Sequence, residues 1–134
     1  MSWTCPSCGR SFANQNQWHS CHACGVGEHF ARAEPQVREA FDAIVAALPV
    51  DVRVEAVKTA IHLRLRKALF ASVNVRRTHL RVGIMLNRRL SHRRIERVEV
   101  LSKTRYAHGV DVWVPEDVDA ELLAWLNEAS ELRL

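Results

Sequence analysis

All four cysteines of the chain lie within its first 24 residues, in two Cys-x-x-Cys pairs. Cys5 and Cys8 form the first pair, and Cys21 and Cys24 repeat the spacing after residues 9–20. Two such pairs can supply four thiolates to a tetrahedral zinc ion. His19 offers an imidazole as an alternative, in a set of three cysteines and one histidine that includes Cys21 or Cys24. The spacing predicts a structural zinc site, whose closed coordination leaves no position for a catalytic water.

A redox dithiol and a disulfide framework are the competing interpretations of these cysteines. A catalytic Cys-x-x-Cys follows a strand and opens a helix, whereas Pro6 and Gly9 favour a turn around the first pair. The start of the chain lacks the charged and apolar blocks of a secretory signal, and no apolar run is long enough to span a membrane. We therefore expect a soluble, cytoplasmic protein without a membrane partner, in which the thiols stay reduced.

The positive charge of the chain is concentrated in its middle. Residues 58–105 contain 14 Lys and Arg residues against 2 Asp and Glu, while the whole chain carries a formal net charge of only +4. Such a block predicts an anionic partner, with nucleic acid as the first candidate. The densest basic run, RRLSHRR, is expected to be a hairpin tip that contacts phosphates. The contact residues expected there are Arg88, Arg89, Arg93 and Arg94.

Hydrophobic periodicity predicts the elements that carry these residues. Residues 34–49 have apolar side chains at helical spacing, and residues 115–134 form a second amphipathic helix, with Pro115 in its first turn and Leu132 on its apolar side. Between them, strand patterns cover residues 52–57, 60–66, 68–75, 78–86, 95–101 and 108–114. The pattern predicts an α+β fold, in which an antiparallel meander of about five to six strands packs against an N-terminal and a C-terminal helix. A zinc-binding finger over residues 1–27 would precede this domain, which would cover residues 33–134.

One face of the predicted sheet stays open if both helices cover the other face. His62, Arg64 and Arg66 alternate along one predicted strand with apolar residues between them, so their side chains should populate that open face. Arg81 on another predicted strand should lie on the same face. We expect a pocket for an anionic ligand there. The ligand-binding residues expected are Lys58, His62, Arg64 and His108.

Two long segments give the chain a family resemblance. WTCPSCGRSFANQNQWHSC followed by VEAVKTAIHLRLRKALFASV resembles a family of bacterial proteins that carry the domain of unknown function 5655. The resemblance extends over nearly the whole chain and implies a short cysteine/histidine head on a small α+β body. It also implies that Cys5, Cys8, His19 and Cys21 are the zinc ligands, and Cys24 is then an alternative fourth ligand. Similar modules occur fused to nuclease-like domains, which points toward nucleic acid.

Three classes of function fit these observations. The first is a zinc-binding, non-catalytic module that contacts nucleic acid through a basic sheet face and hairpin. The second is a module that binds a small anionic molecule or a protein in a pocket. Arginines spread over a flat face would support the first class, and arginines that converge in a concavity would support the second. An enzyme is the third class, but the sequence has no Gly-rich phosphate loop, no nucleophile elbow and no paired carboxylates in the basic block, so we expect no catalytic residues.

Overall fold

The computed structural model describes residues 3–4, 11–12 and 26–132 of the chain. Strands β1 (Trp3–Thr4) and β2 (Ser11–Phe12) pair with each other antiparallel. The predicted zinc ligands lie outside the described residues. These ligands are Cys5, Cys8, His19, Cys21 and Cys24.

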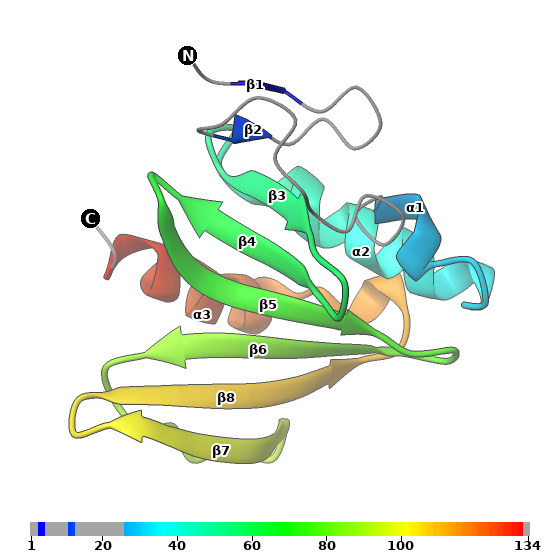
Figure 1. Ribbon diagram of the computed structural model, residues 1–134. Helices are drawn as coiled ribbons and strands as arrows, with labels where there is room; N and C mark the ends of the chain where they lie inside the picture. The colour runs from blue at the N-terminus through cyan, green and yellow to red at the C-terminus, as the bar shows by residue number, and fades with distance from the viewer. Residues whose placement is uncertain (1–2, 5–10, 13–25, 133–134) are drawn as a thin grey trace.

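A six-stranded antiparallel sheet forms the centre of the described structure, and its strands follow the order β3-β4-β5-β6-β8-β7 (Figure 1). The strands are β3 (Arg53–Ala56), β4 (Ile61–Leu65), β5 (Ala68–Val75), β6 (Leu80–Leu86), β7 (Ile95–Ser102) and β8 (Arg105–Val112). The prediction of six antiparallel strands is confirmed, but the simple meander was wrong beyond β6. Strand β8 pairs with both β6 and β7, which leaves β7 at the edge of the sheet. Residues 87–94 connect β6 to β7, and a connection of this length can cross the two strand spacings involved, about 10 Å.

Helices α2 (Pro35–Ala47) and α3 (Ala120–Glu131) both lie behind the sheet in Figure 1, as predicted. A single turn, α1 (Val26–His29), precedes α2. The second helix begins later than predicted, because Pro115 belongs to a separate 3₁₀ turn, η2 (Pro115–Asp117), and Asp119 caps α3 by accepting a hydrogen bond from the Leu122 N–H. Leu132, predicted on the apolar side, is exposed. None of the helices in the described part of the chain combines the length and apolar character needed to cross a membrane.

The core lies between the sheet and its two helices. Alternation along β4 and β6 places every second side chain on the helix side, where Ile61, Leu63, Val82 and Ile84 are buried. The helices contribute apolar side chains at helical spacing, such as Phe41 on α2. The remaining side chains of these strands point to the opposite face, which none of the described helices covers.

The hairpin between β4 and β5 turns through Arg66 and Lys67, whose φ angles are 60° and 101°. Positive φ at both central residues is the geometry of the tightest hairpin turns, which favour Asn-Gly. Arg66 was predicted to continue the strand and to lie on the open face, but β4 ends at Leu65 and Arg66 is an exposed turn residue.

Candidate anion-binding site

Two glycines face each other at the centre of the open face. Gly83 on β6 pairs directly with Gly109 on β8. Glycine inside a strand weakens it and marks a place where another group approaches closely. A Cβ atom on Gly109 would lie 3.1 Å from Arg97 Nη2 and 3.3 Å from Arg97 Nε. The guanidinium of Arg97 therefore reaches from the edge strand β7 across β8, over the place where a side chain would stand.

The second glycine leaves room for a hydroxyl group. A Cβ atom on Gly83 would lie 3.1 Å from Ser72 Oγ, which projects from the neighbouring strand β5. Ser72, Gly83, Gly109 and Arg97 follow one another in register across four adjacent strands. The glycine pair thus forms a low floor between a hydroxyl group on one side and a guanidinium on the other.

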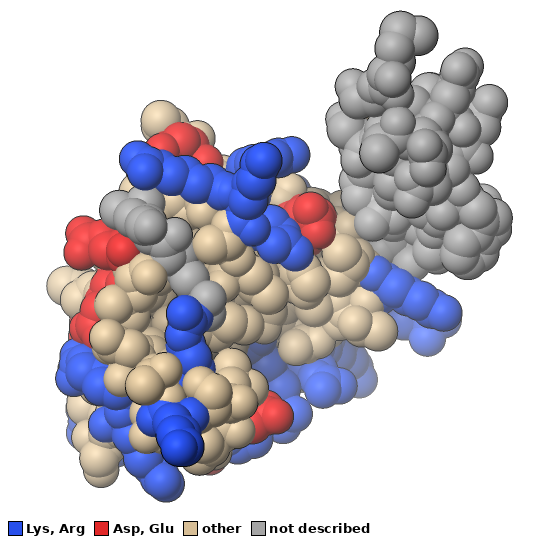
Figure 2. All heavy atoms as spheres, turned by 60° about the vertical axis from the view of Figure 1, so that its left-hand side comes forward, with Lys and Arg blue, Asp and Glu red and all other residues tan. Residues whose placement is uncertain are grey.

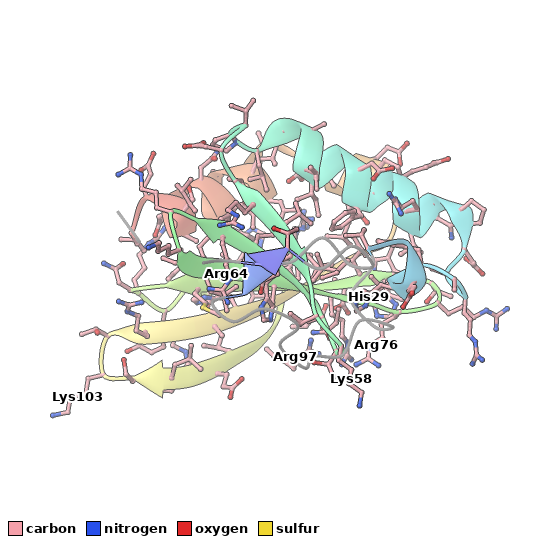
Figure 3. The ribbon with its side chains drawn as sticks, turned by 45° about the horizontal axis from the view of Figure 1, so that its top comes forward. His29, Lys58, Arg64, Arg76, Arg97 and Lys103 are labelled. Carbon is pink, nitrogen blue, oxygen red and sulfur yellow. The ribbon has the colours of Figure 1, made fainter. Side chains whose placement is uncertain are left out.

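An open groove of about 520 Å³ lies over this floor. Three arginines line it: Arg76 after β5, Arg81 on β6 and Arg97 on β7. In Figure 3, Arg76 and Arg97 lie close together on the side of the sheet away from α2. Asn74 and Glu99 also line the groove.

The three groove arginines lie outside the ion pairs of the described structure, although Asp111 on β8 stands directly opposite Arg81 in the strand pairing. In the described part of the chain, none of them forms an ion pair with a carboxylate. Nε of Arg81 is also buried without a hydrogen-bond partner. A buried donor that stays unpaired costs free energy. A ligand in the groove cannot reach this buried atom, so Arg81 could contact it only through its other atoms, which line the groove.

The predicted ligand-binding residues are not brought together in one pocket. Lys58 is exposed in the turn between β3 and β4. His62 and Arg64 do lie on the open face, where His62 Nδ1 and Arg64 Nε are 3.9 Å and 3.6 Å from a Glu55 oxygen. Burial and the nearby Arg64 charge lower the pKa of His62, although Glu55 opposes this. His108 points to the helix side of the sheet and is buried.

His108 makes two hydrogen bonds to the backbone. Its Nε2 accepts from the Leu90 N–H at 2.9 Å, and its Nδ1 lies 3.3 Å from the Ile84 carbonyl oxygen. Since the carbonyl can only accept, Nδ1 carries the proton and the ring is neutral. Burial lowers the pKa of His108, the hydrogen bond to Ile84 opposes this, and the Arg88 and Arg89 charges lower it further.

Two of the four arginines in the basic run between β6 and β7 form hydrogen bonds with α3 or with its capping residue. Arg88 donates two hydrogen bonds to the Glu128 carboxylate, at 2.9 and 2.8 Å, and these hold the pKa of Glu128 below its usual range. Arg94 donates to Asp119 Oδ1 at 2.8 Å and to a backbone carbonyl oxygen at 2.8 Å. Arg89 and Arg93 are exposed and form no ion pair within the described residues.

Sequence reasoning identified Arg81 as a basic residue of the sheet but missed its neighbours in the groove. Arg97 sits in the alternating segment IERVEVL, and Gly83 and Gly109 each interrupt an alternating strand. An isolated glycine within a strand pattern signals close approach, so the two glycines were the available signal. Their pairing depends on β8 lying beside β6, which the pattern did not reveal.

The predicted zinc ligands lie outside the described residues, so the structure does not test the predicted zinc site. Among them, no group of three or more His, Cys, Asp or Glu side chains could hold a metal ion. The groove itself holds one carboxylate, that of Glu99.

Comparison with known proteins gives a family and no characterised relative. No curated protein and no solved structure matches the chain. The model of the family described as "Domain of unknown function (DUF5655)" matches residues 26–133. The match begins at α1, so it covers the α+β body and not the cysteine-containing head, over which the resemblance was also expected to extend. The chain thus belongs to the DUF5655 family.

Proposed function

We propose that the protein is a non-catalytic binding module that holds an anionic partner, nucleic acid in the first place, on the open face of its sheet. The observation that carries the anionic part of this proposal is the groove lined by Arg76, Arg81 and Arg97, which form no ion pair within the described residues. Guanidinium groups that are free of internal ion pairs can give their full charge and their paired donors to a phosphate.

Further cations lie on the exposed surface outside the groove and favour a polyanion. Figure 2 shows Lys and Arg side chains in separate groups over one side of the molecule, with a few Asp and Glu between them. The exposed basic residues without an ion pair in the described structure include Arg66, Lys67, Arg89, Arg93 and Lys103. Contacts of this kind hold a nucleic acid by its phosphates and carry no sequence information.

A small anionic ligand is the second candidate. It is favoured because the three arginines converge in one concavity instead of lying on a flat face. Catalysis has less support from the groove, since a metal-dependent nuclease needs several convergent carboxylates and the described groove offers only Glu99.

Binding across a salt series tests the proposal. The purified protein is titrated against generic duplex and single-stranded DNA and RNA from low to physiological salt. We expect affinity to fall steeply with salt, with a slope of about −0.9 for each duplex phosphate contacted. Replacing Arg76, Arg81 and Arg97 with Gln should weaken binding and flatten the slope. A control that removes the same charge from Arg66, Lys67 and Lys103 should have a smaller effect, and equal effects would contradict a role for the groove.

We also propose a structural zinc ion in the N-terminal head. The support is the spacing of Cys5, Cys8 and Cys21, completed by His19 or Cys24. Such a site needs reduced thiols, which fits a cytoplasmic location. Metal analysis of the purified protein should find one zinc per chain, and a metal-free folded protein would contradict the proposal.

A further inference from the structure

We propose that the groove recognises a terminal phosphomonoester group and not an internal phosphodiester. This inference rests on the proposed function, because it names the anionic group that the same groove holds. The groups that act on the ligand are Arg76, Arg81, Arg97, Ser72 and Asn74.

The charge of the groove matches a dianion. Three guanidinium groups and the carboxylate of Glu99 leave two positive charges in the concavity. A phosphomonoester carries about −1.5 to −2 charges at neutral pH, whereas each internal phosphate of a nucleic acid carries one. A single internal phosphate would leave one of these two positive charges uncompensated.

The donors line the groove from different strands. Arg97 lies over Gly109 from the edge strand, and Ser72 stands beside Gly83 on the opposite side of the glycine floor. Arg81 lines the same groove from β6, which lies between β5 and β8. A monoester offers three terminal oxygens as acceptors, so it can engage guanidinium and hydroxyl donors that lie on different sides of it.

The glycine floor sets how close the ligand can come. Without Cβ atoms at Gly83 and Gly109, a tetrahedral group can settle between Ser72 and Arg97 near the backbone. A methyl group at either position would crowd one of these donors and force it to shift by a few tenths of an ångström, since it would lie 3.1 Å from its nearest atom. The glycine pair is therefore a specificity feature of the site.

Two molecules can present a phosphomonoester, a small phosphorylated metabolite and the 5′-phosphorylated end of a nucleic-acid strand. The test uses one short oligonucleotide in two forms, with a 5′-phosphate and with a 5′-hydroxyl, and ribose 5-phosphate as a competitor. We expect the 5′-phosphorylated form to bind the full-length protein at least tenfold more tightly. Competition by ribose 5-phosphate at comparable concentration would identify the isolated group as sufficient, and its failure to compete would identify a strand end as the ligand.

Gly109→Ala separates the geometry of the site from its charge. This variant keeps every charged residue and displaces only the Arg97 guanidinium, so it should remove most of the preference for the 5′-phosphate. Gly27→Ala is the matched control, because a Cβ atom there meets nothing within 4 Å. Arg97→Gln gives the same information if Gly109→Ala proves too unstable to purify.

The outcomes distinguish this inference from the proposed function. Equal binding of both oligonucleotides, weakened equally by the Gln substitutions in the groove, would overturn the monoester inference and leave the proposed function standing. Binding that the Gln substitutions do not change would overturn both.

Discussion

The buried His108 side chain binds the connection between β6 and β7, because its Nε2 accepts a hydrogen bond from the Leu90 N–H at 2.9 Å. The other ring nitrogen is held by the Ile84 carbonyl oxygen. Both interactions require the neutral ring with its proton on Nδ1. A protonated ring would place an N–H group against the Leu90 N–H, so the attachment of this connection depends on His108 staying neutral.

The stability of the fold should therefore fall in mild acid. Burial holds the pKa of folded His108 below its unfolded value of 6.5. The unfolded state consequently binds more protons between the two values, and the free energy of unfolding decreases as the pH falls from about 6.5 toward the folded pKa. Urea denaturation at a series of pH values between 5 and 8 measures this decrease.

His108→Gln is the informative variant for this dependence, because an amide oxygen can accept the Leu90 N–H bond and does not titrate. The pKa of His62 is also lowered, so His62→Gln is compared in parallel. A pH dependence that survives unchanged in His108→Gln would contradict the assignment.

Asp119 should contribute to stability through two different bonds. Its carboxylate accepts the Leu122 N–H at 3.0 Å as the cap of α3 and the Arg94 guanidinium at 2.8 Å. Asp119→Ala removes both and should lower the free energy of unfolding by about 1 to 2 kcal/mol. Asp119→Asn keeps a capping oxygen and should lose less, as measured by urea denaturation at neutral pH. Equal losses in the two variants would show that the cap contributes little.

Substitution of the hairpin-turn residues Arg66 and Lys67 should increase the stability of the fold. Each residue has a positive φ, which costs an ordinary L-residue roughly 1 to 2 kcal/mol. Substituting Asn-Gly suits this turn, and after the entropy that glycine loses on folding the net gain should be about 1 kcal/mol. Thermal denaturation measures the gain. An Ala-Ala variant removes the same two charges without relieving the backbone and should show no gain; a matching gain there would assign the effect to charge.

Cys5→Ser should release the proposed zinc ion from the head. The head has few apolar groups, so its folding free energy should come largely from the metal. Atomic absorption of the purified variant should find less than one zinc per chain. Cys24→Ser and His19→Ala decide the fourth ligand, since only the variant that lacks a true ligand should lose metal. Full retention of zinc by Cys5→Ser would contradict the site.

In the basic run, two arginines should contribute to nucleic-acid binding and the other two to the stability of the fold. Arg89→Gln with Arg93→Gln removes exposed charges without breaking an ion pair in the described structure, and should weaken nucleic-acid binding and reduce the salt slope by about 2 at most. Arg88→Gln with Arg94→Gln breaks the contacts with α3, and should cost stability more than it costs affinity. The two pairs are compared by binding and by denaturation of the same preparations. The opposite pattern would exclude phosphate contact by Arg89 and Arg93.

The number of strands and most of their positions could be predicted because strands such as β4, β6 and β8 bury alternate side chains, a pattern that the sequence displays directly. Strand β7 alternates in sequence but buries none of its side chains. The order of the strands could not be predicted, since the alternation of IERVEVL and of HGVDVWV is the same whether β7 or β8 lies beside β6. The face on which the His108 side chain lies could not be predicted for a related reason. It shares its face with Val110 and Val112, whose burial shows that this face packs on the helices, and a histidine is compatible with either face.

The groove was less accessible to sequence reasoning than the fold. Arg76, Arg81 and Arg97 come from three segments of the chain, and only the register across β5, β6, β8 and β7 brings them together. The prediction that the basic run contacts phosphates did not include the ion pair between Arg88 and α3. Glu128 lies 40 positions from Arg88, and no local sequence pattern links the two.

The position of β8 also constrains the order in which the chain can assemble. Strands β3 to β6 pair in sequence order and can zip together through local hairpins, which is fast. The free edge of β6 can pair only after β8 has been synthesised. Strand β8 follows β7 in the chain and pairs with both β6 and β7. On the ribosome the sheet cannot be completed until residues beyond Val112 have emerged. A nascent four-stranded form would have β6 as an additional exposed edge strand, and such an edge is open to edge-to-edge association.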